Sequence, residues 1–186
     1  VEGSGLAGVH YAMHYLPQRN REVAGDSIPE EQKIEPASKT AVILGGGFTA
    51  ADCLGNLNRQ GADPRVHQFE LVDMVPRPTP VHKEANPDCR ANILTESITD
   101  DGNGRVKALN GVSVEWKSET NGSSTSGRMT MQRIPGSEFT VTADLVFLAM
   151  GFLGPKVEDL LEELGVEFNV RGGVKNHTPV QIKKML

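Results

Sequence analysis

Residues 42–53 read VILGGGFTAADC, so three glycines directly follow a short apolar run. The segment 40–46 is predicted to form a buried strand, and residues 48–60 a helix that ends at Gly61. Residues 65–72, RVHQFELV, predict a second strand. A strand, a glycine turn, a helix and a second strand in this order predict a right-handed βαβ unit with parallel strands.

The glycine turn fits a dinucleotide-binding pattern, because Gly45, Gly47 and Ala50 match G-x-G-x-x-A. In such turns the first glycine makes the tight turn and the second lets a pyrophosphate approach the main chain. The third small residue lets the helix pack closely against the strand. The helix N-terminus adds free N–H groups and a positive dipole end. A merely structural turn is the alternative, but the place between a strand and a helix favours nucleotide binding.

The ribose-binding residue of such a fold is expected near the end of the second strand. Glu70 stands there and could accept hydrogen bonds from the ribose hydroxyls, which would favour NADH. Arg77 follows a few residues later and could instead meet the 2′-phosphate of NADPH. A solvated strand-end carboxylate and a surface arginine are the alternatives, so the choice between NADH and NADPH stays open.

The rest of the chain predicts further elements around the βαβ unit. Residues 8–21 predict a helix whose second half is interrupted by Pro17, and the proline-rich segment 73–92 predicts irregular structure. Alternating segments predict a small antiparallel meander, residues 143–151 a buried strand and residues 157–166 a short amphipathic helix. The meander segments are 93–101, 106–117, 128–134 and 137–142.

These elements together predict an α/β fold, a Rossmann-like nucleotide-binding domain with a parallel sheet, flanking helices and a small antiparallel β-meander. We expect three parts along the chain. Residues 1–38 would form an N-terminal helix and linker, and residues 39–155 the NAD(P)H-binding domain. Residues 156–186 would form a C-terminal helix and tail.

The charge balance excludes two classes of partner. The chain has a formal net charge of −5 and no basic stripe, which argues against a nucleic-acid surface and against an anionic membrane. The longest apolar run, residues 143–154, is too short to span a bilayer. The N-terminus lacks the basic start of a signal peptide, and we therefore expect a cytoplasmic protein.

Residue types that bind metals or act as nucleophiles occur without motif spacing. Cys53 and Cys89 lie far apart with no CxxC pattern, which favours a reduced setting. Four potential ligands cluster in a proline-rich stretch that is predicted to be a solvated loop, so we expect no metal site: His82, Glu84, Asp88 and Cys89. No residue stands in a context that predicts a self-contained catalytic site.

Five stretches of the chain resemble the small subunit, or the C-terminal flavoprotein region, of glutamate synthases. They are GVHYAMHYLPQRNR, VILGGGFTAADCLGNLNRQGA, VHQFELV, GVSVEW and IPGSEFTVTADLVFLAMGFLGP. The similarity runs in order over almost the whole chain, and the last stretch is much more specific than the glycine pattern. VHQFELV is closer to the branch with plant and fungal NADH enzymes and some actinobacterial ones.

The resemblance implies a role in electron transfer. In that family the corresponding segment is the central NAD(P)H-binding domain, inserted into an FAD-binding domain. NAD(P)H gives a hydride to FAD, and electrons pass through iron–sulfur clusters to FMN in the large subunit, where glutamate is made. The implied partners are therefore an FAD-binding domain and the glutamate synthase large subunit or domain.

The resemblance also implies cofactor-binding positions. Glu70 would lie near the adenosine ribose, and Phe48 stands where the family usually has an aspartate that can cap the helix or meet the cofactor. The positions at the pyrophosphate would be Gly45, Gly46, Gly47, Thr49 and Ala50. The positions at the end of the 143–151 strand would be Ala149, Met150 and Gly151.

The segments that hold FAD and iron–sulfur clusters in the family have no counterpart in these 186 residues. We therefore expect the chain to act as part of a larger protein and to be inactive alone. Phe48 and the short segment 77–92 suggest one alternative, a degenerate Rossmann-like domain with a structural or partner-docking role. The NAD(P)H domain of a related flavoprotein reductase, such as one like dihydropyrimidine dehydrogenase, is the other.

Overall fold

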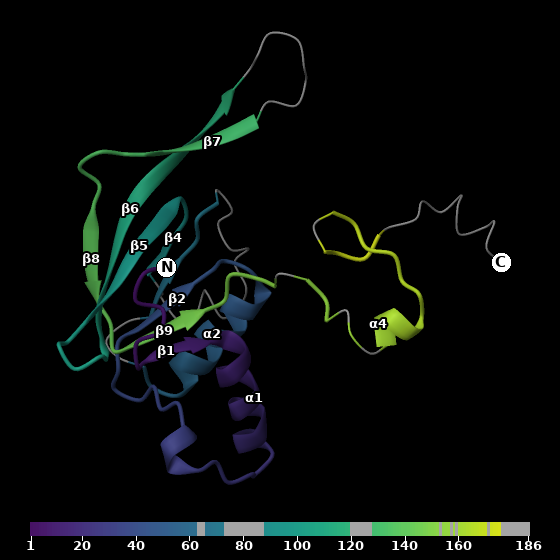
Figure 1. Ribbon diagram of the computed structural model, residues 1–186. Coiled ribbons are helices and arrows are strands. Elements are labelled where there is room, and N and C mark those ends of the chain that lie inside the picture. The colour runs from purple at the N-terminus through teal and green to yellow at the C-terminus, as the bar shows by residue number, and fades with distance from the viewer. Residues whose placement is uncertain are drawn as a thin grey trace. The chain divides into compact units, whose positions relative to one another are not determined.

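The computed structural model describes residues 1–62, 66–72, 88–119, 128–152, 154–156, 158, 160–170 and 172–175. They belong to two units, Val1–Met150 and Gly151–Leu186, each of which is described by itself (Figure 1). Among the described residues, no helix has the length and apolar character needed to cross a membrane.

A five-stranded parallel sheet forms the centre of the first unit, with the strand order β1-β9-β2-β3-β4 (Figure 1). Its strands are β1 (Val9–Tyr11), β2 (Ala41–Leu44), β3 (Val66–Phe69), β4 (Asp88–Arg90) and β9 (Leu145–Leu148). Helix α2 (Phe48–Arg59) connects β2 to β3, and these two strands pair in parallel from Ala41 opposite Val66. The predicted βαβ unit is thus confirmed.

Both faces of the parallel sheet are covered. Ala41 and Ile43 of β2 belong to the core under helices α1 (Ala12–Val23) and α2. Val42 and Leu44 belong to a second core, shared with an antiparallel sheet. Because successive side chains of a strand point to opposite faces, a strand buried on both sides needs a continuous apolar run. That requirement explains the sequence AVIL, in which all four residues are buried.

The antiparallel sheet consists of β5 (Ile93–Asp100), β6 (Val106–Glu119), β7 (Arg128–Arg133) and β8 (Phe139–Thr142). β6 is its central strand and pairs with all three others. The predicted meander differs in one respect, because β7 and β8 pair with successive halves of β6 instead of with each other. Pro135 and Gly136 form the turn between them, which divides the returning chain into two strands.

Two edge strands correct the sequence prediction. The segment 8–21, predicted to be a helix that Pro17 interrupts in its second half, begins with β1 instead. The segment 73–92, predicted to be irregular, contains β4 near its end. Each strand has three residues and is held by a longer-range partner, β1 by β9 and β4 by β3. Such short strands carry little periodicity of their own, since their pairing depends on distant residues. Residues 73–87 lie outside the described residues.

Helix α1 continues past Pro17 to Val23, farther than predicted. Proline removes the hydrogen bond to the carbonyl four residues earlier, here that of Met13, and Met13 is 50% exposed. The carbonyl can therefore bond to water. In the second unit, α4 (Leu160–Glu163) lies within the helix predicted over 157–166, and Phe168 pairs with Val174 in an isolated bridge.

Candidate functional site

The carboxyl ends of the central parallel strands bring the predicted cofactor residues together. The backbone N–H of Gly45 donates to Phe69 O at 2.8 Å, and that of Ala149 donates to Leu44 O at 2.8 Å. The glycine turn, the end of β3 and the end of β9 are thus joined by main-chain hydrogen bonds. Ligands of open α/β folds bind at this edge of the sheet.

Gly45 occupies a position that only glycine can hold. Its φ of +127° lies in a region that side chains rarely adopt, and a Cβ atom there would stand 2.3 Å from Ala149 O. The chain leaves β2 at this point and passes directly over the end of β9. The first glycine therefore makes the sharp turn that starts helix α2.

Gly47 is exposed and begins helix α2 as its N-cap, with no side-chain cap hydrogen bond. A Cβ atom at Gly47 would meet nothing within 4 Å, so the space beside it is open. The first N–H groups of a helix have no intrahelical partner, and the first turn of α2 contains no acidic residue. Open space, free donors and a positive helix end together suit an anion.

The next three residues differ in burial. Phe48, the first residue of α2, is 79% exposed, whereas Ala50 is fully buried in the core under the helices. Thr49 is partly buried. The small side chain of Ala50 lets α2 pack against the sheet, and the side chain of Phe48 is mostly exposed to solvent.

Two further exposed apolar side chains stand at the carboxyl edge. Met150 follows β9 and is 61% exposed, and Tyr11 ends β1 and is also 61% exposed. Tyr11 makes an edge-to-face contact with His14. The position of Tyr11 at this edge was not predicted, because the residue lies in a segment predicted to be helical. Gly151, with a φ of +85°, begins the second unit.

Glu70 turns its carboxylate back onto the glycine turn. Its Oε2 accepts the N–H of Gly46 at 2.5 Å, and its Oε1 accepts those of Leu71 at 2.7 Å and Val72 at 3.2 Å. A carboxylate offers about four lone-pair sites, so it can take another donor. The predicted ribose-binding residue therefore lies beside the turn. Arg77 lies outside the described residues.

Gln68 contacts the glycine turn, and the sequence did not predict this contact. It is only 1% exposed, its Nε2 donates to Gly45 O at 2.9 Å, and its Oε1 accepts the thiol of Cys89 at 3.4 Å. The available signal was its place two residues after Val66 in β3, since that spacing puts a polar amide on the buried, helix-facing side of the strand.

Neither cysteine suits thiol chemistry at neutral pH. Burial raises the pKa of Cys53 to about 12 and that of Cys89 to about 11, and the thiolate is the reactive form. Within the part of the chain that the structure describes, no three potential ligands group around a metal position.

Asp88 and Cys89 correct the predicted solvated loop, because both belong to β4. Asp88 contacts His67 at 2.9 Å and accepts hydrogen bonds from Arg90 at 2.6 and 2.9 Å. The Arg90 guanidinium lies over the rings of Phe69 and Phe139. These contacts give Asp88 a structural role at the sheet edge. His82 and Glu84 lie outside the described residues.

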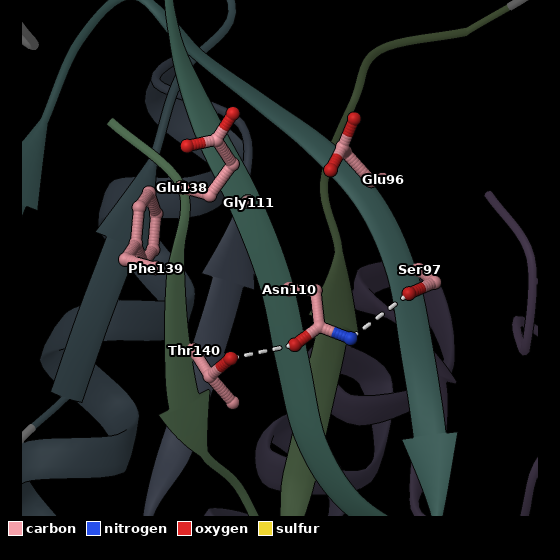
Figure 2. A pocket seen from close by; sticks show the side chains of 7 residues that line it. All are labelled: Glu96, Ser97, Asn110, Gly111, Glu138, Phe139 and Thr140. Carbon is pink, nitrogen blue, oxygen red and sulfur yellow. Dashed lines mark hydrogen bonds between the residues drawn. The ribbon is translucent and has the colours of Figure 1, made fainter. Parts of the chain in front are cut away.

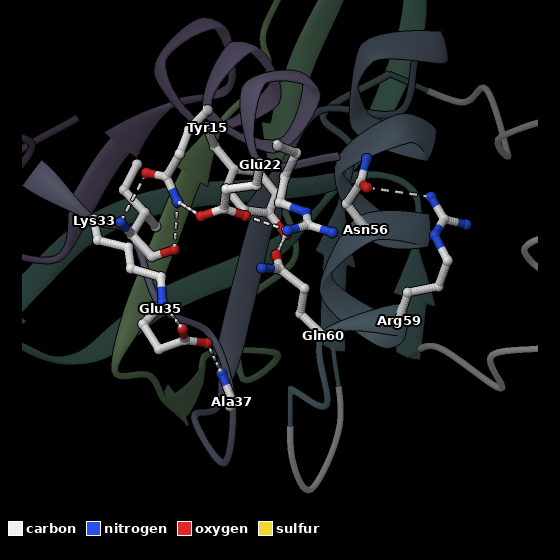
Figure 3. Close-up of polar contacts among 11 residues, drawn as sticks. Tyr15, Glu22, Lys33, Glu35, Ala37, Asn56, Arg59 and Gln60 are labelled. Carbon is white, nitrogen blue, oxygen red and sulfur yellow. Dashed lines mark hydrogen bonds and ion pairs between the residues drawn. The ribbon is translucent and has the colours of Figure 1, made fainter. Parts of the chain in front are cut away.

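Two polar hollows lie elsewhere in the first unit. One, of about 420 Å³, lies on the antiparallel sheet (Figure 2). The other, of about 370 Å³, lies between α1, the segment after it and the end of α2. Polar contacts surround the second hollow: Lys33 pairs with Glu35 at 3.0 Å, and the lining residue Gln60 accepts the hydroxyl of the buried Tyr15 at 2.5 Å (Figure 3). The length of α2 separates this hollow from Gly47.

Comparison with known proteins identifies the family. Residues 3–183 match the family model described as pyridine nucleotide-disulphide oxidoreductase. The chain belongs to this family. Solved structures with a similar fold include Mycobacterium tuberculosis FprA in complex with NADPH, with a TM-score of 0.63 and 14% identity over 96% of this chain and 51% of that one. The thioredoxin reductase of T. acidophilum has a TM-score of 0.51 and 19% identity over 74% of this chain and 38% of that one.

Its relatives include glutamate synthase small chains, which confirms the resemblance seen in the sequence. The Mycobacterium tuberculosis glutamate synthase [NADPH] small chain is 38% identical over 94% of this chain and 37% of the relative. The Bacillus subtilis small chain is 30% identical over 89% of this chain and 36% of the relative. The Schizosaccharomyces pombe glutamate synthase [NADH] is 32% identical over 92% of this chain and 9% of the relative. The chain thus spans little more than a third of the small chains that it matches.

Proposed function

We propose that this chain is the NAD(P)H-binding module of a larger flavoprotein of the glutamate synthase small-chain type. The observation that carries the proposal is the open position beside Gly47, at a helix N-terminus without acidic residues. NADH or NADPH bound there would supply a hydride for FAD. We propose that FAD, the iron–sulfur clusters and the large-subunit partner lie outside this chain and that the chain alone is inactive.

The residues of the site would have distinct tasks. The N–H groups of Gly47, Phe48 and Thr49 would hold the pyrophosphate, and Gly45 and Ala50 would let the turn and the helix take their positions. The Gly46 peptide would stay fixed beside Glu70, whose carboxylate would accept the ribose hydroxyls. The end of β9, at Ala149, Met150 and Gly151, would border the nicotinamide end. Arg77 remains the candidate for a 2′-phosphate contact.

Titration of the purified chain with NADH and with NADPH tests this proposal, with Phe48→Asp as a matched variant. We expect both proteins to bind the dinucleotides. The affinity of the variant should differ from that of the wild type, because an aspartate can cap α2 but also repels phosphate. Tighter binding of NADH than of NADPH would support Glu70 as the ribose-binding residue. If neither protein binds either dinucleotide, a structural or partner-docking role replaces the proposal.

A further inference from the structure

Two glutamines are the buried polar side chains among the described residues, Gln18 and Gln68. A buried amide is costly unless it is hydrogen-bonded, and both amides are bonded to backbone. Gln18 of α1 exchanges two hydrogen bonds with the main chain of Ile34, at 3.0 and 2.8 Å. Gln68 donates to the carbonyl of Gly45. The first therefore fixes a connecting segment and the second the glycine turn.

β3 holds both ends of one peptide group in that turn. The carbonyl of Gly45 and the N–H of Gly46 belong to the same planar peptide. Gln68 binds the carbonyl at 2.9 Å, and Glu70 binds the N–H at 2.5 Å. Gln68 lies in β3 and Glu70 directly follows that strand, and their side chains bind the two ends of the same peptide. The peptide plane cannot rotate while both contacts persist.

The Gln68 amide has a contact at each end. The Cys89 thiol donates to Oε1 and Nε2 donates to Gly45 O, so the two contacts agree with one orientation of the amide. An apolar side chain of similar length would fill the same space in the core. What the amide adds is a donor directed at one carbonyl of the glycine turn.

We infer that Gln68 is a positioning residue of the cofactor site. Gln68 gives this peptide a second contact beside that from Glu70, so the peptide keeps its orientation when Glu70 also accepts ribose hydroxyls. The turn then still presents the N–H groups at the start of α2 to the pyrophosphate. This inference rests on the proposed function, since it assigns a residue to the same site.

The test compares Gln68→Met with Gln18→Met, two variants that each remove a buried amide of the same length. NADH affinity and the urea unfolding midpoint are measured for both and for the wild-type chain. We expect both variants to lose stability. Gln68→Met should weaken NADH binding by about tenfold, the effect of one lost hydrogen bond in the bound state, while Gln18→Met keeps the wild-type affinity.

A second variant, Gln68→Glu, covers the case in which Gln68→Met does not fold. An ionised carboxylate cannot donate to Gly45 O, whereas a protonated one can. The NADH affinity of Gln68→Glu, relative to that of the wild type, should therefore recover as the pH falls from about 8 to about 6, because burial raises the pKa of a carboxylic acid. Cys89 stays a neutral thiol over this range, since burial raises its pKa to about 11.

The outcomes separate the two claims. A folded Gln68→Met chain that binds NADH as tightly as the wild type overturns the positioning role alone. Equal losses of affinity in Gln68→Met and Gln18→Met also overturn it, because they would reflect general instability. The positioning role is also contradicted if the NADH affinity of Gln68→Glu relative to the wild type stays constant across the pH range. A wild-type chain that binds neither NADH nor NADPH overturns the proposed function, and the cofactor role of Gln68 with it.

Discussion

The glycine turn and the hollow on the antiparallel sheet are both polar and both open, yet their polar groups are used differently. In the hollow, Asn110 donates to Ser97 Oγ at 3.1 Å and accepts from Thr140 at 2.8 Å, so its amide is bound at both ends (Figure 2). Glu96 pairs with Arg133 at 2.9 Å. At the turn, the first N–H groups of α2 have no intrahelical partner. A hollow whose polar groups are already paired is therefore weaker evidence of a ligand site than backbone N–H groups that lack an intrahelical partner.

The charges of the hollow and of the glycine turn also differ. Glu96 and Glu138 both line the hollow, which disfavours a phosphate there. The first turn of α2 has no acidic residue, and the nearby Glu70 carboxylate is engaged by three N–H groups. The charges therefore favour the turn over the hollow as the position proposed for an anion.

The largest expected effect comes from Gly45→Ala. The new Cβ would stand 2.3 Å from Ala149 O in a backbone conformation with a φ of +127°. Strain and overpacking together should lower the free energy of unfolding by about 3 kcal/mol. Urea denaturation measures this loss.

Gly104→Ala is the matched control, because Gly104 also has a positive φ, +79°, but open space at its Cβ. This variant should lose only about 1 kcal/mol, the cost of the left-handed conformation. Similar losses in the two variants would show that the contact with Ala149 does not decide the identity of residue 45.

Gly47→Val should separate binding from folding. The space beside Gly47 is empty and its backbone is extended, so the fold should tolerate a side chain there. A pyrophosphate would need that same space, and NADH affinity should fall by about thirtyfold. Asn110→Ala in the hollow should instead cost about 1 kcal/mol of stability and leave the affinity unchanged. The reverse pattern in a binding titration would assign the ligand to the hollow.

The core of this site could be predicted from sequence because the signals are local. Gly45, Gly47 and Ala50 lie within one short stretch, and the strand before them is apolar at every position. A tight turn and a close helix both restrict the residue types directly. Glu70 was predicted from its place at the end of a strand, and it lies beside the turn as the fold requires.

Glu70→Gln changes the charge beside the turn while keeping the shape of the side chain. The single amide oxygen can accept either the Gly46 N–H or those of Leu71 and Val72, and it is a weaker acceptor for ribose hydroxyls. NADH affinity should fall by about fivefold, and NADPH affinity should fall less because its 2′-phosphate no longer meets a carboxylate. Glu96→Gln is the control, and an equal effect there would point to a change in overall charge.

The smallest effect concerns acid stability at the β3–β4 edge. The Arg90 side chain, with a contribution from His67, lowers the pKa of Asp88 below its ordinary value. A lowered folded-state pKa stabilises the fold above the unfolded value of about 3.9, and this contribution is lost as the pH falls through the folded-state pKa. Asp88→Asn should therefore be less stable at neutral pH by under about 1 kcal/mol and equal to the wild type below about pH 2. Urea midpoints across this range measure the difference, and a constant gap would contradict the cause.

The parts that could not be predicted depend on distant partners. β1 and β4 have three residues each and exist because β9 and β3 pair with them. Gln68 reads as an ordinary strand residue until the turn that it holds is in place. Tyr11 reaches the carboxyl edge only because its strand does. Such contacts join residues far apart in the sequence, so no local pattern specifies them.

The central claim is that a pyridine nucleotide binds at the start of α2, and amide chemical shifts of the chain under NADH titration test it most directly. The account predicts saturable shifts concentrated at residues 46–50 and at Glu70, with the resonances of Ser97, Asn110 and Thr140 unchanged. Shifts confined to the hollow of the antiparallel sheet, or no saturable shifts with either NADH or NADPH, would contradict it.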